Sequence, residues 1–432
     1  MEAKMFDQKR YDNYLKILNH ELVPALGCTE PIAIAYAAAK ARQVLGRMPE
    51  KLEILCSGNI IKNVMGVTVP NSGGLKGIEA AAILGAVGGS ADAGLEVLQT
   101  ITDEHRFQAQ TLLQQDICVV KLLSSPENLH IIVKVKAAGH EALVEIKSEH
   151  THITRIERDG QVLFETQGIA ANELSDLDYS GLSVKRILDF AEAVRVDDVR
   201  TLLDNQIRLN IAISDEGLKH DWGANVGRTL IEVFGNDIRT RAKARAAAGS
   251  DARMSGCVLP VIINSGSGNQ GMTVSLPVIE YAIELNAGEE KLYRALVLSN
   301  LISIHQKHQI GRLSAYCGAV SAAAGSGAGI AYLHGCSYDE IADTISNTIA
   351  NVGGIVCDGA KPSCAAKIAS SVDAAIMAFE MSRKDRRFAP GEGLVKENIE
   401  RTIESVGRMG RQGMKGTDVE ILNIMIDAPE KP

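Results

Sequence analysis

The chain has 432 residues, enough for roughly two or three domains, which rules out a miniprotein held together by disulfides or metal alone. Its 45 Lys and Arg against 53 Asp and Glu give a formal net charge of −8, which repels phosphate backbones and anionic lipid. We therefore expect neither nucleic acid nor a membrane among its partners. Hydrophobic residues at 46% and charged residues at 23% exclude global disorder, and aromatic residues at only 4% leave the core to Ala, Val, Ile and Leu.

The start of the chain and its cysteine usage indicate the compartment. Residues 1–18 mix acidic and basic side chains and contain no apolar stretch of the kind that directs secretion, so we expect a cytoplasmic protein. Eight cysteines are too few for a disulfide scaffold of this length. In a reducing compartment, clustered thiols more often bind metal or take part in chemistry, so their spacing is informative.

The first elements in the chain alternate between helices and Gly-rich breaks. Apolar residues recur at helical spacing over 8–19, and the segment GCTEP at 27–31 interrupts that pattern. Pro31 suits the first turn of a second helix, so Cys28 is expected in a loop at a helix N-terminus. A short strand over 52–59, a Gly/Ser loop over 70–77 and an Ala-rich helix are expected to follow.

The middle of the chain has a different residue pattern. Residues of about 95–168 show β-branched alternation with turn signals between the runs, which predicts an antiparallel sheet with one or two helices. Helical periodicity returns from Leu177 onward. We therefore predict a mainly α protein with an α+β insertion, in which a helical catalytic domain (1–94 and 169–432) is interrupted by a small antiparallel-sheet domain (95–168).

One segment has the length of a membrane span. Residues 313–337 contain no Asp, Glu, Lys or Arg and carry a GxxxG pattern at Gly325 and Gly329. The segment is built from Gly, Ala and Ser rather than Leu, Ile and Phe, and His334 lies near its end. Small residues let neighbouring backbones approach closely, so we expect a helix buried in protein.

The cysteines of the C-terminal half are the strongest chemical signal. Cys317 lies in AYCGAV, and Cys357 and Cys364 lie in GGIVCDGAKPSC, where Gly359 and Pro362 allow a turn that brings both sulfurs to one side. Helix starts beside such cysteines stabilise thiolate charge. Three sulfurs suit an iron–sulfur cluster with one unligated iron better than a closed zinc site. Spacing alone leaves metal binding and buried inert cysteine about equally open.

Four segments carry a resemblance to a known family: GCTEP at 27–31, SGSGNQG at 265–271, LSAYCGA at 313–319 and GGIVCDGAKPSC at 353–364. They resemble the L-cysteine desulfidase family, which is related to the α chain of bacterial iron–sulfur L-serine dehydratases, and the match runs essentially the full length. The resemblance implies a [4Fe–4S] cluster held by Cys317, Cys357 and Cys364, whose fourth iron acts as a Lewis acid on the leaving group. It also implies α,β-elimination of L-cysteine to hydrogen sulfide, pyruvate and ammonia.

The resemblance suggests roles for the residues at the first Gly break. Cys28 is expected to supply the base that removes the Cα proton or, in the resting state, a fourth cluster ligand. Its place at a helix start is expected to lower its pKa and give a thiolate near neutral pH, although Glu30 opposes this. Thr29 beside it is a candidate substrate contact.

Two Gly-rich loops are candidate carboxylate sites. SGSGNQG follows an apolar run and precedes a helix, so its backbone N–H groups could form an anion nest for the substrate α-carboxylate. The candidate contacts there are Asn264, Ser265, Gly266, Asn269 and Gln270. A simple Gly-rich turn with capping residues is the alternative, and the resemblance favours binding. The loop PNSGGLKG is a weaker candidate through Asn71, Ser72 and Gly73, with Lys76 as a cationic partner.

Other tempting residues have plainer interpretations. His305 and His308 have HxxH spacing, but such a pair on a helix is more often structural. Cys56 and Cys118 lie in strand-like runs and are expected in the core. Cys257 and Cys336 lie near the proposed site in sequence and are less favoured as substitutes for one of the three cluster ligands. The basic run from Arg239 to Arg245 is expected to be a solvated helix face.

The sequence leaves three alternatives to a cysteine lyase open. L-serine is the second candidate substrate for the same cluster chemistry. A pyridoxal-phosphate lyase could use SGNQG for the substrate carboxylate and Lys243 as its Schiff-base lysine, but the repeated βα units and the second Gly-rich loop that it needs are not found. A non-catalytic iron–sulfur sensor would keep the three cysteines without carboxylate-binding loops. The oligomeric state is left open, homo-oligomer included.

Overall fold

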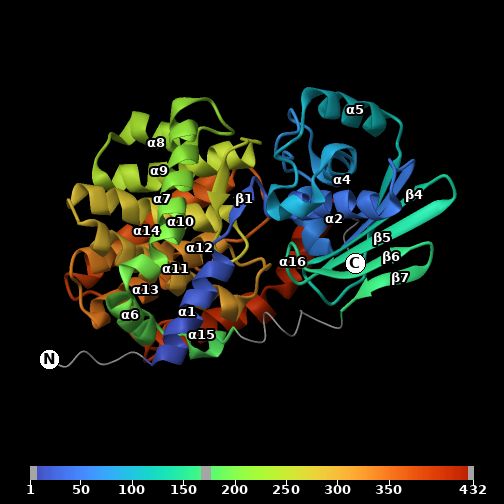
Figure 1. Ribbon diagram of the computed structural model, residues 1–432. Coiled ribbons are helices and arrows are strands. Elements are labelled where there is room, and N and C mark those ends of the chain that lie inside the picture. Colours follow the sequence, from blue (N-terminus) through green and yellow to red (C-terminus); the bar gives the residue numbers. More distant parts are fainter. Residues whose placement is uncertain (1–6, 167–176, 427–432) are drawn as a thin grey trace.

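The computed structural model describes residues 7–166 and 177–426, which form a larger helical lobe and a smaller lobe that contains a sheet (Figure 1). The mainly α fold with an α+β part is therefore confirmed. The helices of the larger lobe are α1 (Gln8–Glu21), α6 (Val184–Ala193), α7 (Val196–Lys219), α8 (Val226–Phe234), α9 (Ile238–Met254), α10 (Gly268–Glu284), α11 (Glu289–Ile310), α12 (Gly318–Leu333), α13 (Tyr338–Val352), α14 (Cys364–Ser382) and α15 (Ile399–Arg408).

The smaller lobe is built around a mixed six-stranded sheet. Its elements are α2 (Thr29–Leu45), β2 (Lys51–Cys56), α3 (Gly58–Val64), α4 (Gly77–Gly88), α5 (Asp103–Gln114), β3 (Cys118–Leu122), β4 (His130–Ala137), β5 (His140–Lys147), β6 (Ile153–Arg158) and β7 (Gln161–Glu165). The remaining elements are β1 (Pro24–Leu26), β8 (Pro260–Ile262), α16 (Lys415–Met425) and the short turns at Ala91–Glu96, Tyr179–Gly181 and Met409–Gly413. Strands β1 and β8 pair antiparallel, and α16 packs against α3.

The sheet takes in a strand from outside the expected range. Its order is β3-β2-β4-β5-β6-β7, in which β2 pairs parallel with β3 and antiparallel with β4. One face of the sheet packs on α2, and the apolar core of this lobe gathers residues from Cys28 to Ile146 together with Met254 of α9. We therefore propose that the smaller unit begins near Thr29 rather than at the expected boundary of 95.

The Gly-rich segment 313–337 supplies the central helix of the larger lobe. A Cβ at Gly325 would lie 2.5 Å from the carbonyl oxygen of Ser299 on α11, and one at Gly329 would lie 2.8 Å from the Val278 side chain on α10. The missing side chains let α12 pack tightly against its neighbours, as expected for a helix buried in protein. Among the helices of the described ranges, none has the length and apolar character that a membrane crossing requires.

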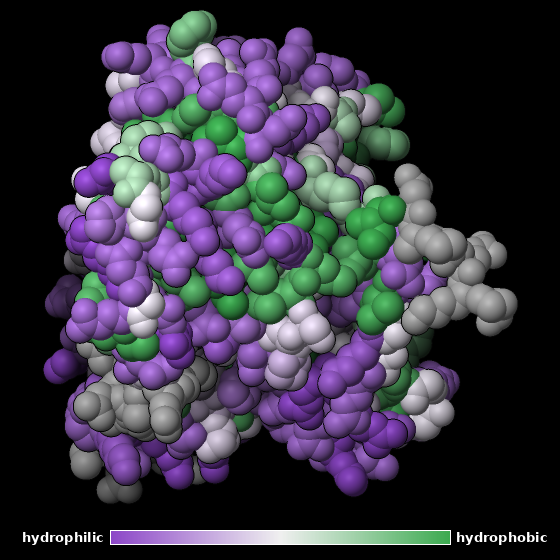
Figure 2. Space-filling view, turned by 90° about the vertical axis from the view of Figure 1, so that its right-hand side faces the viewer, coloured by the Kyte–Doolittle hydropathy of each residue, from purple (hydrophilic) through white to green (hydrophobic). Residues whose placement is uncertain are grey.

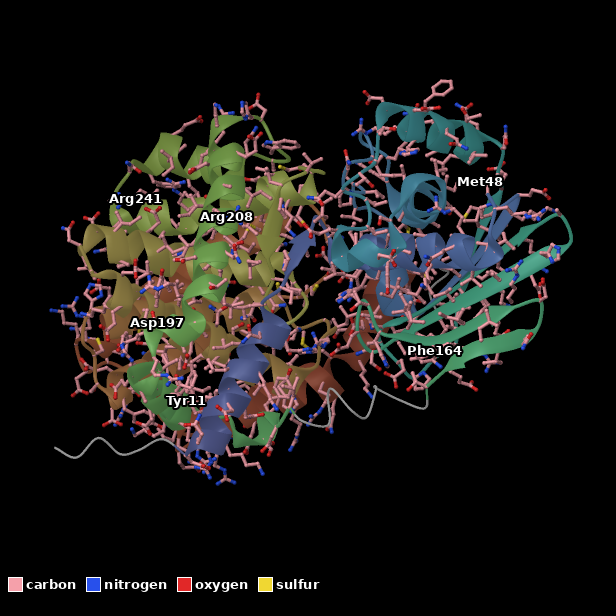
Figure 3. The ribbon with its side chains drawn as sticks, viewed as in Figure 1. Tyr11, Met48, Phe164, Asp197, Arg208 and Arg241 are labelled. Carbon is pink, nitrogen blue, oxygen red and sulfur yellow. The ribbon has the colours of Figure 1, made fainter. Side chains whose placement is uncertain are left out.

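Helix α1 is fixed to the larger lobe through aromatic and polar contacts. Tyr11, labelled in Figure 3, meets the Phe190 ring edge-on at 5.4 Å between centroids. Its hydroxyl donates a hydrogen bond to Asp198 at 2.6 Å. Together these contacts anchor the first half of α1, the helix that leads through β1 to Cys28 at the start of α2.

The outer surface of the smaller lobe is not uniformly polar. Figure 2 shows apolar residues gathered in a band across an otherwise hydrophilic face. Exposed apolar side chains lie on the edge strand β3, at Val119 and Leu122, and on α16, at Val419 and Ile424. Phe164, labelled in Figure 3, is 46% exposed on the opposite edge strand β7.

Candidate active site

Residues of both lobes line one small cavity of about 100 Å³. The smaller lobe contributes the first turn of α2 and Asn63 of α3, and the larger lobe contributes the rest. Cys28, Cys317, Cys357 and Cys364, which are up to 336 positions apart in the chain (364 − 28 = 336), all line this cavity. The structure therefore brings together the four cysteines that the sequence analysis selected.

Four helices begin at this cavity. Cys28 is the N-cap of α2, Ser267 the N-cap of α10 and Cys317 the N-cap of α12, while Cys364 is the first residue of α14. The first N–H groups of each helix have no partner within the helix, and the helix dipole adds partial positive charge there. Converging N-termini therefore make the cavity suited to anionic groups, whether thiolates or a carboxylate.

Backbone hydrogen bonds join the two loops that carry Cys317 and Cys357. The Cys357 N–H donates to the Ala315 carbonyl at 2.6 Å, and the Cys317 N–H donates to the Ile355 carbonyl at 3.1 Å. The two segments thus run side by side like a short antiparallel ladder, with a bridge between Tyr316 and Val356. This pairing sets the relative position of the two cysteines.

A buried ion pair supports both loops from behind. Lys62 of α3, whose side chain is 1% exposed, pairs with Asp418 of α16 and donates to the Cys357 carbonyl at 3.2 Å. The other carboxylate oxygen of Asp418 accepts the Ala315 N–H at 3.0 Å. Helix α16 therefore acts on the site through Asp418, which connects one cysteine loop to the other.

The thiols of the larger lobe influence one another. Burial and the nearby Cys357 raise the pKa of Cys317 to about 12 and that of Cys364 to about 11. The Cys317 and Cys364 thiols are therefore protonated near neutral pH without metal, because their helix starts do not outweigh burial. Within residues 7–166 and 177–426, no group of three or more His, Cys, Asp or Glu side chains is close enough to hold a metal ion.

Cys28 forms a pair with Glu30. Its thiol donates to the Glu30 carboxylate at 2.9 Å, and the Thr29 hydroxyl donates to the Gly266 carbonyl at 2.9 Å. Burial, followed by the charge of Glu30, raises the pKa of Cys28 well above its usual value. The expected thiolate near neutral pH is therefore wrong for this structure, because burial and the neighbouring carboxylate outweigh the helix start.

The turn before α10 lies partly at the cavity. Asn269 and Gln270 line it, and Gln270 Oε1 is buried with no hydrogen-bond partner among the described residues. Asn264 is fully buried and instead donates to Asn300 Oδ1 at 3.0 Å. Ser265 faces a neighbouring cavity, and the Gly266 carbonyl receives the Thr29 hydroxyl. The start of α10, rather than the whole turn, is therefore available to a ligand.

The second Gly-rich loop is not brought to the cavity. The Asn71 amide donates to the Leu98 and Ile101 carbonyls, and the Ser72 hydroxyl donates to the Leu75 carbonyl. Neither residue lines the cavity, nor does Gly73. The loop instead supports the site indirectly, because a Cβ at Gly27, beside Cys28, would lie 2.0 Å from the Pro70 ring.

Three cationic residues that the sequence analysis did not select also line the cavity: Arg253, Lys307 and Arg312. Lys307 is 4% exposed, and its ammonium group has no hydrogen bond or ion pair among the described residues. Burial lowers the pKa of Lys307 below its usual value, and the nearby Cys357 and Cys317 offset only part of this effect. A charge in the middle of a helical pattern gives no sign of burial, and the small residues around Arg253 in RAAAGSDARM are the only signal that could have suggested it.

Arg312 joins the lobes at the edge of the site. Its guanidinium donates to Glu149 of the smaller lobe at 2.7 Å and to Glu21 of the larger lobe at 3.2 Å. Burial raises the pKa of Glu149, but a hydrogen bond with His20 and the charge of Arg312 outweigh burial and bring it to about 2. Lys307 and Arg312 also line a neighbouring cavity of about 320 Å³.

The histidines, cysteines and lysine that the sequence analysis set aside lie outside the cavity. His305 pairs with Glu400 at 2.7 Å, and His308 stacks on Tyr179 at 4.8 Å between ring centroids. Neither Cys257 nor Cys336 lines the cavity. Lys243, which a Schiff-base enzyme would need in its active site, forms an ion pair with Asp373 instead.

Comparison with known proteins places the chain in a family. The model of the family described as serine dehydratase alpha chain matches residues 92–423. A UPF0597 protein of Lachnoclostridium phytofermentans is 57% identical over 417 residues, covering 96% of this chain and all of that protein. UPF0597 proteins of Desulfitobacterium hafniense and Treponema denticola are 55% and 47% identical, covering 96% and 97% of this chain and 97% and 99% of those proteins.

The chain therefore belongs to the serine dehydratase alpha-chain family, a class of lyases. Within that class it is similar over nearly its whole length to the UPF0597 proteins. The relation to the α chain of iron–sulfur serine dehydratases that the cysteine segments suggested is thereby confirmed.

Proposed function

We propose that this protein is an iron–sulfur-dependent lyase that eliminates hydrogen sulfide from L-cysteine, giving pyruvate and ammonia. In this reaction the Cα proton leaves to a base, the Cα–H electron pair forms the Cα=Cβ bond and the Cβ–S bond breaks. Water then converts the released aminoacrylate to pyruvate and ammonia. The observation that carries the proposal is the convergence of four cysteines and four helix N-termini on one cavity.

The donor set suits a [4Fe–4S] cluster held by Cys317, Cys357 and Cys364. Three thiols on two joined loops and one helix start line one cavity, and the Lys307 side chain lines it with them. The cysteine loops must draw closer to ligate a cluster, and metal binding would displace the thiol protons despite the raised pKa values of Cys317 and Cys364. When bound, the cluster supplies a Lewis-acidic iron for the leaving group.

Cys28 and Glu30 are placed to move the proton. The Cys28 thiol already donates to Glu30, so transfer of that proton leaves a thiolate that can accept the proton from Cα. The N-terminus of α10, with the side chains of Asn269 and Gln270, provides donors for a bound substrate. Cys28 is 2% exposed, and its burial strengthens the electrostatic interactions around it.

L-serine is the second candidate substrate. The family match favours it, because the family is described by its serine dehydratase activity. Serine differs from cysteine only in the leaving atom, and hydroxide leaves less readily than hydrosulfide. The same residues would therefore serve both substrates, and the preference would lie in the leaving group.

The test is an anaerobic assay of the purified protein with each amino acid. We expect sulfide release from L-cysteine to exceed pyruvate formation from L-serine, measured as kcat/KM. Pyruvate from L-serine alone would assign the second function. Formation of pyruvate from neither amino acid by protein that contains iron would contradict both and favour the sensor.

Variants separate the roles within the site. Cys317→Ala, Cys357→Ala and Cys364→Ala are each expected to lose the brown absorbance of the cluster together with activity. Cys28→Ala is expected to keep the absorbance and lose turnover. Cys336→Ala, which removes a cysteine outside the cavity, is the matched control and is expected to keep both.

A further inference from the structure

Arg253 is a buried guanidinium that the residues around it leave largely unsatisfied. It lies in the last turn of α9, is 2% exposed and lines the cavity. Its Nη1 donates to Asn269 Oδ1 at 3.2 Å, but its Nε has no hydrogen-bond partner and no carboxylate pairs with it among the described residues. An arginine presents five N–H donors, and a buried charge without a partner is costly.

The first residue of α10, Gly268, leaves room for this side chain. A Cβ at Gly268 would lie 2.3 Å from Arg253 Nε and 2.6 Å from the Val261 side chain. Glycine at this position therefore lets the guanidinium lie against the first turn of α10. Ser267 caps the Gln270 N–H, so the first N–H groups of α10 that remain uncapped lie at the same cavity as Arg253.

The other cations at the cavity have different surroundings. Arg312 is already paired with Glu21 and Glu149. The titratable groups that act most strongly on Lys307 are Cys357 and Cys317. Arg253 instead lies near Cys28 and Glu30, the pair placed to move the proton, and near Cys364 at the start of α14. The cavity is thus polarised, with a guanidinium and a carboxylate near Cys28 and an ammonium near the cysteines of the joined loops.

We propose that Arg253 binds the α-carboxylate of the substrate in a bidentate manner, and that Glu30 faces its α-ammonium group. This inference rests on the proposed function only in taking the substrate to be a small amino acid. Planar guanidinium groups match carboxylates through two parallel N–H···O bonds. With the carboxylate held there, Cα lies beside Cys28 and the β-substituent extends toward Lys307 and the joined loops. The site therefore selects free α-amino acids and rejects those whose carboxylate is blocked.

The test uses L-alanine, which has both charged groups of the substrate and no leaving group. Binding to the anaerobic holoenzyme is measured by calorimetry for L-alanine and for L-alaninamide, which lacks the carboxylate. We expect wild type to prefer L-alanine, and Arg253→Met to bind it about 10- to 100-fold more weakly with little change for the amide. Arg253→Lys keeps the charge in case the Met variant fails to fold, and is expected to lose about tenfold.

Arg245→Met is the matched control, because Arg245 lies on the same helix and pairs with Glu280 outside the cavity. It is expected to change L-alanine affinity less than twofold. Failure of wild type to bind L-alanine, or an unchanged preference over the amide in both Arg253 variants, would overturn the inference. Arg253-dependent binding without elimination of L-cysteine or L-serine would leave it standing and contradict the proposed function alone.

Discussion

Neutralising Asp418 should destabilise the protein far more than its surface position on α16 suggests. Asp418→Asn would leave the Lys62 ammonium, 1% exposed, without a counter-charge. Loss of one partner of a buried ion pair costs roughly 3–5 kcal/mol. The Asp418 side chain is itself 14% exposed, so solvent offsets part of this cost and we expect the lower end, about 3 kcal/mol.

The assay is urea denaturation of the metal-free protein, followed by circular dichroism. Asp373→Asn is the matched control, because Asp373 also pairs with a lysine, Lys243, but is 60% exposed, and it should cost less than about 1 kcal/mol. The double variant Lys62→Met with Asp418→Asn should recover much of the loss, since no uncompensated charge remains. A loss for Asp418→Asn no larger than that of the control would refute the reasoning.

Three further predictions concern charge and packing. Lys307→Met should raise the free energy of unfolding of the metal-free protein by about 1–2 kcal/mol, because it removes an unpaired buried ammonium. The measurement is urea denaturation, and a lower urea midpoint for the variant than for wild type would contradict this. The pKa of His20 is raised by its hydrogen bond to Glu149, and that of Glu149 is lowered, so their contact should stabilise most between about pH 4.5 and 6.5. Stability should fall on both sides of that window, and Glu149→Gln should flatten this dependence in melting temperatures measured against pH. Gly271→Ala would place a Cβ 1.9 Å from the Ile262 carbonyl oxygen. It should lower the melting temperature by several degrees, which corresponds to about 1–3 kcal/mol or more. An unchanged melting temperature would contradict this, because it would mean that α10 and β8 move apart without cost.

Local sequence signals predicted the helical fold because they act over a few residues. The apolar period over 8–19, Pro31 and the small residues of 313–337 each correspond to a helix or its start. The sheet was predicted less completely. Strand β2 pairs with β3 and β4, and the paired residues lie 66 to 85 positions apart in the chain. No local pattern reports such long-range pairing.

The candidate site was likewise predicted only in part from the sequence. The four cysteines were identifiable because each stands beside a Gly-rich break, and three of them, Cys28, Cys317 and Cys364, lie at a helix start. Arg253 was not identifiable, since its importance depends on the room left by Gly268. The raised pKa of Cys28 was missed for a related reason, because burial arises only when both lobes close over the thiol.

The most direct test of the central claim is the iron and acid-labile sulfide content per chain of anaerobically purified protein. We predict about four irons per chain in wild type and in Cys28→Ala. We predict almost none in Cys317→Ala, Cys357→Ala and Cys364→Ala, each with a folded spectrum in circular dichroism. Full iron content in any one of those three variants would contradict the claim that these cysteines hold one cluster.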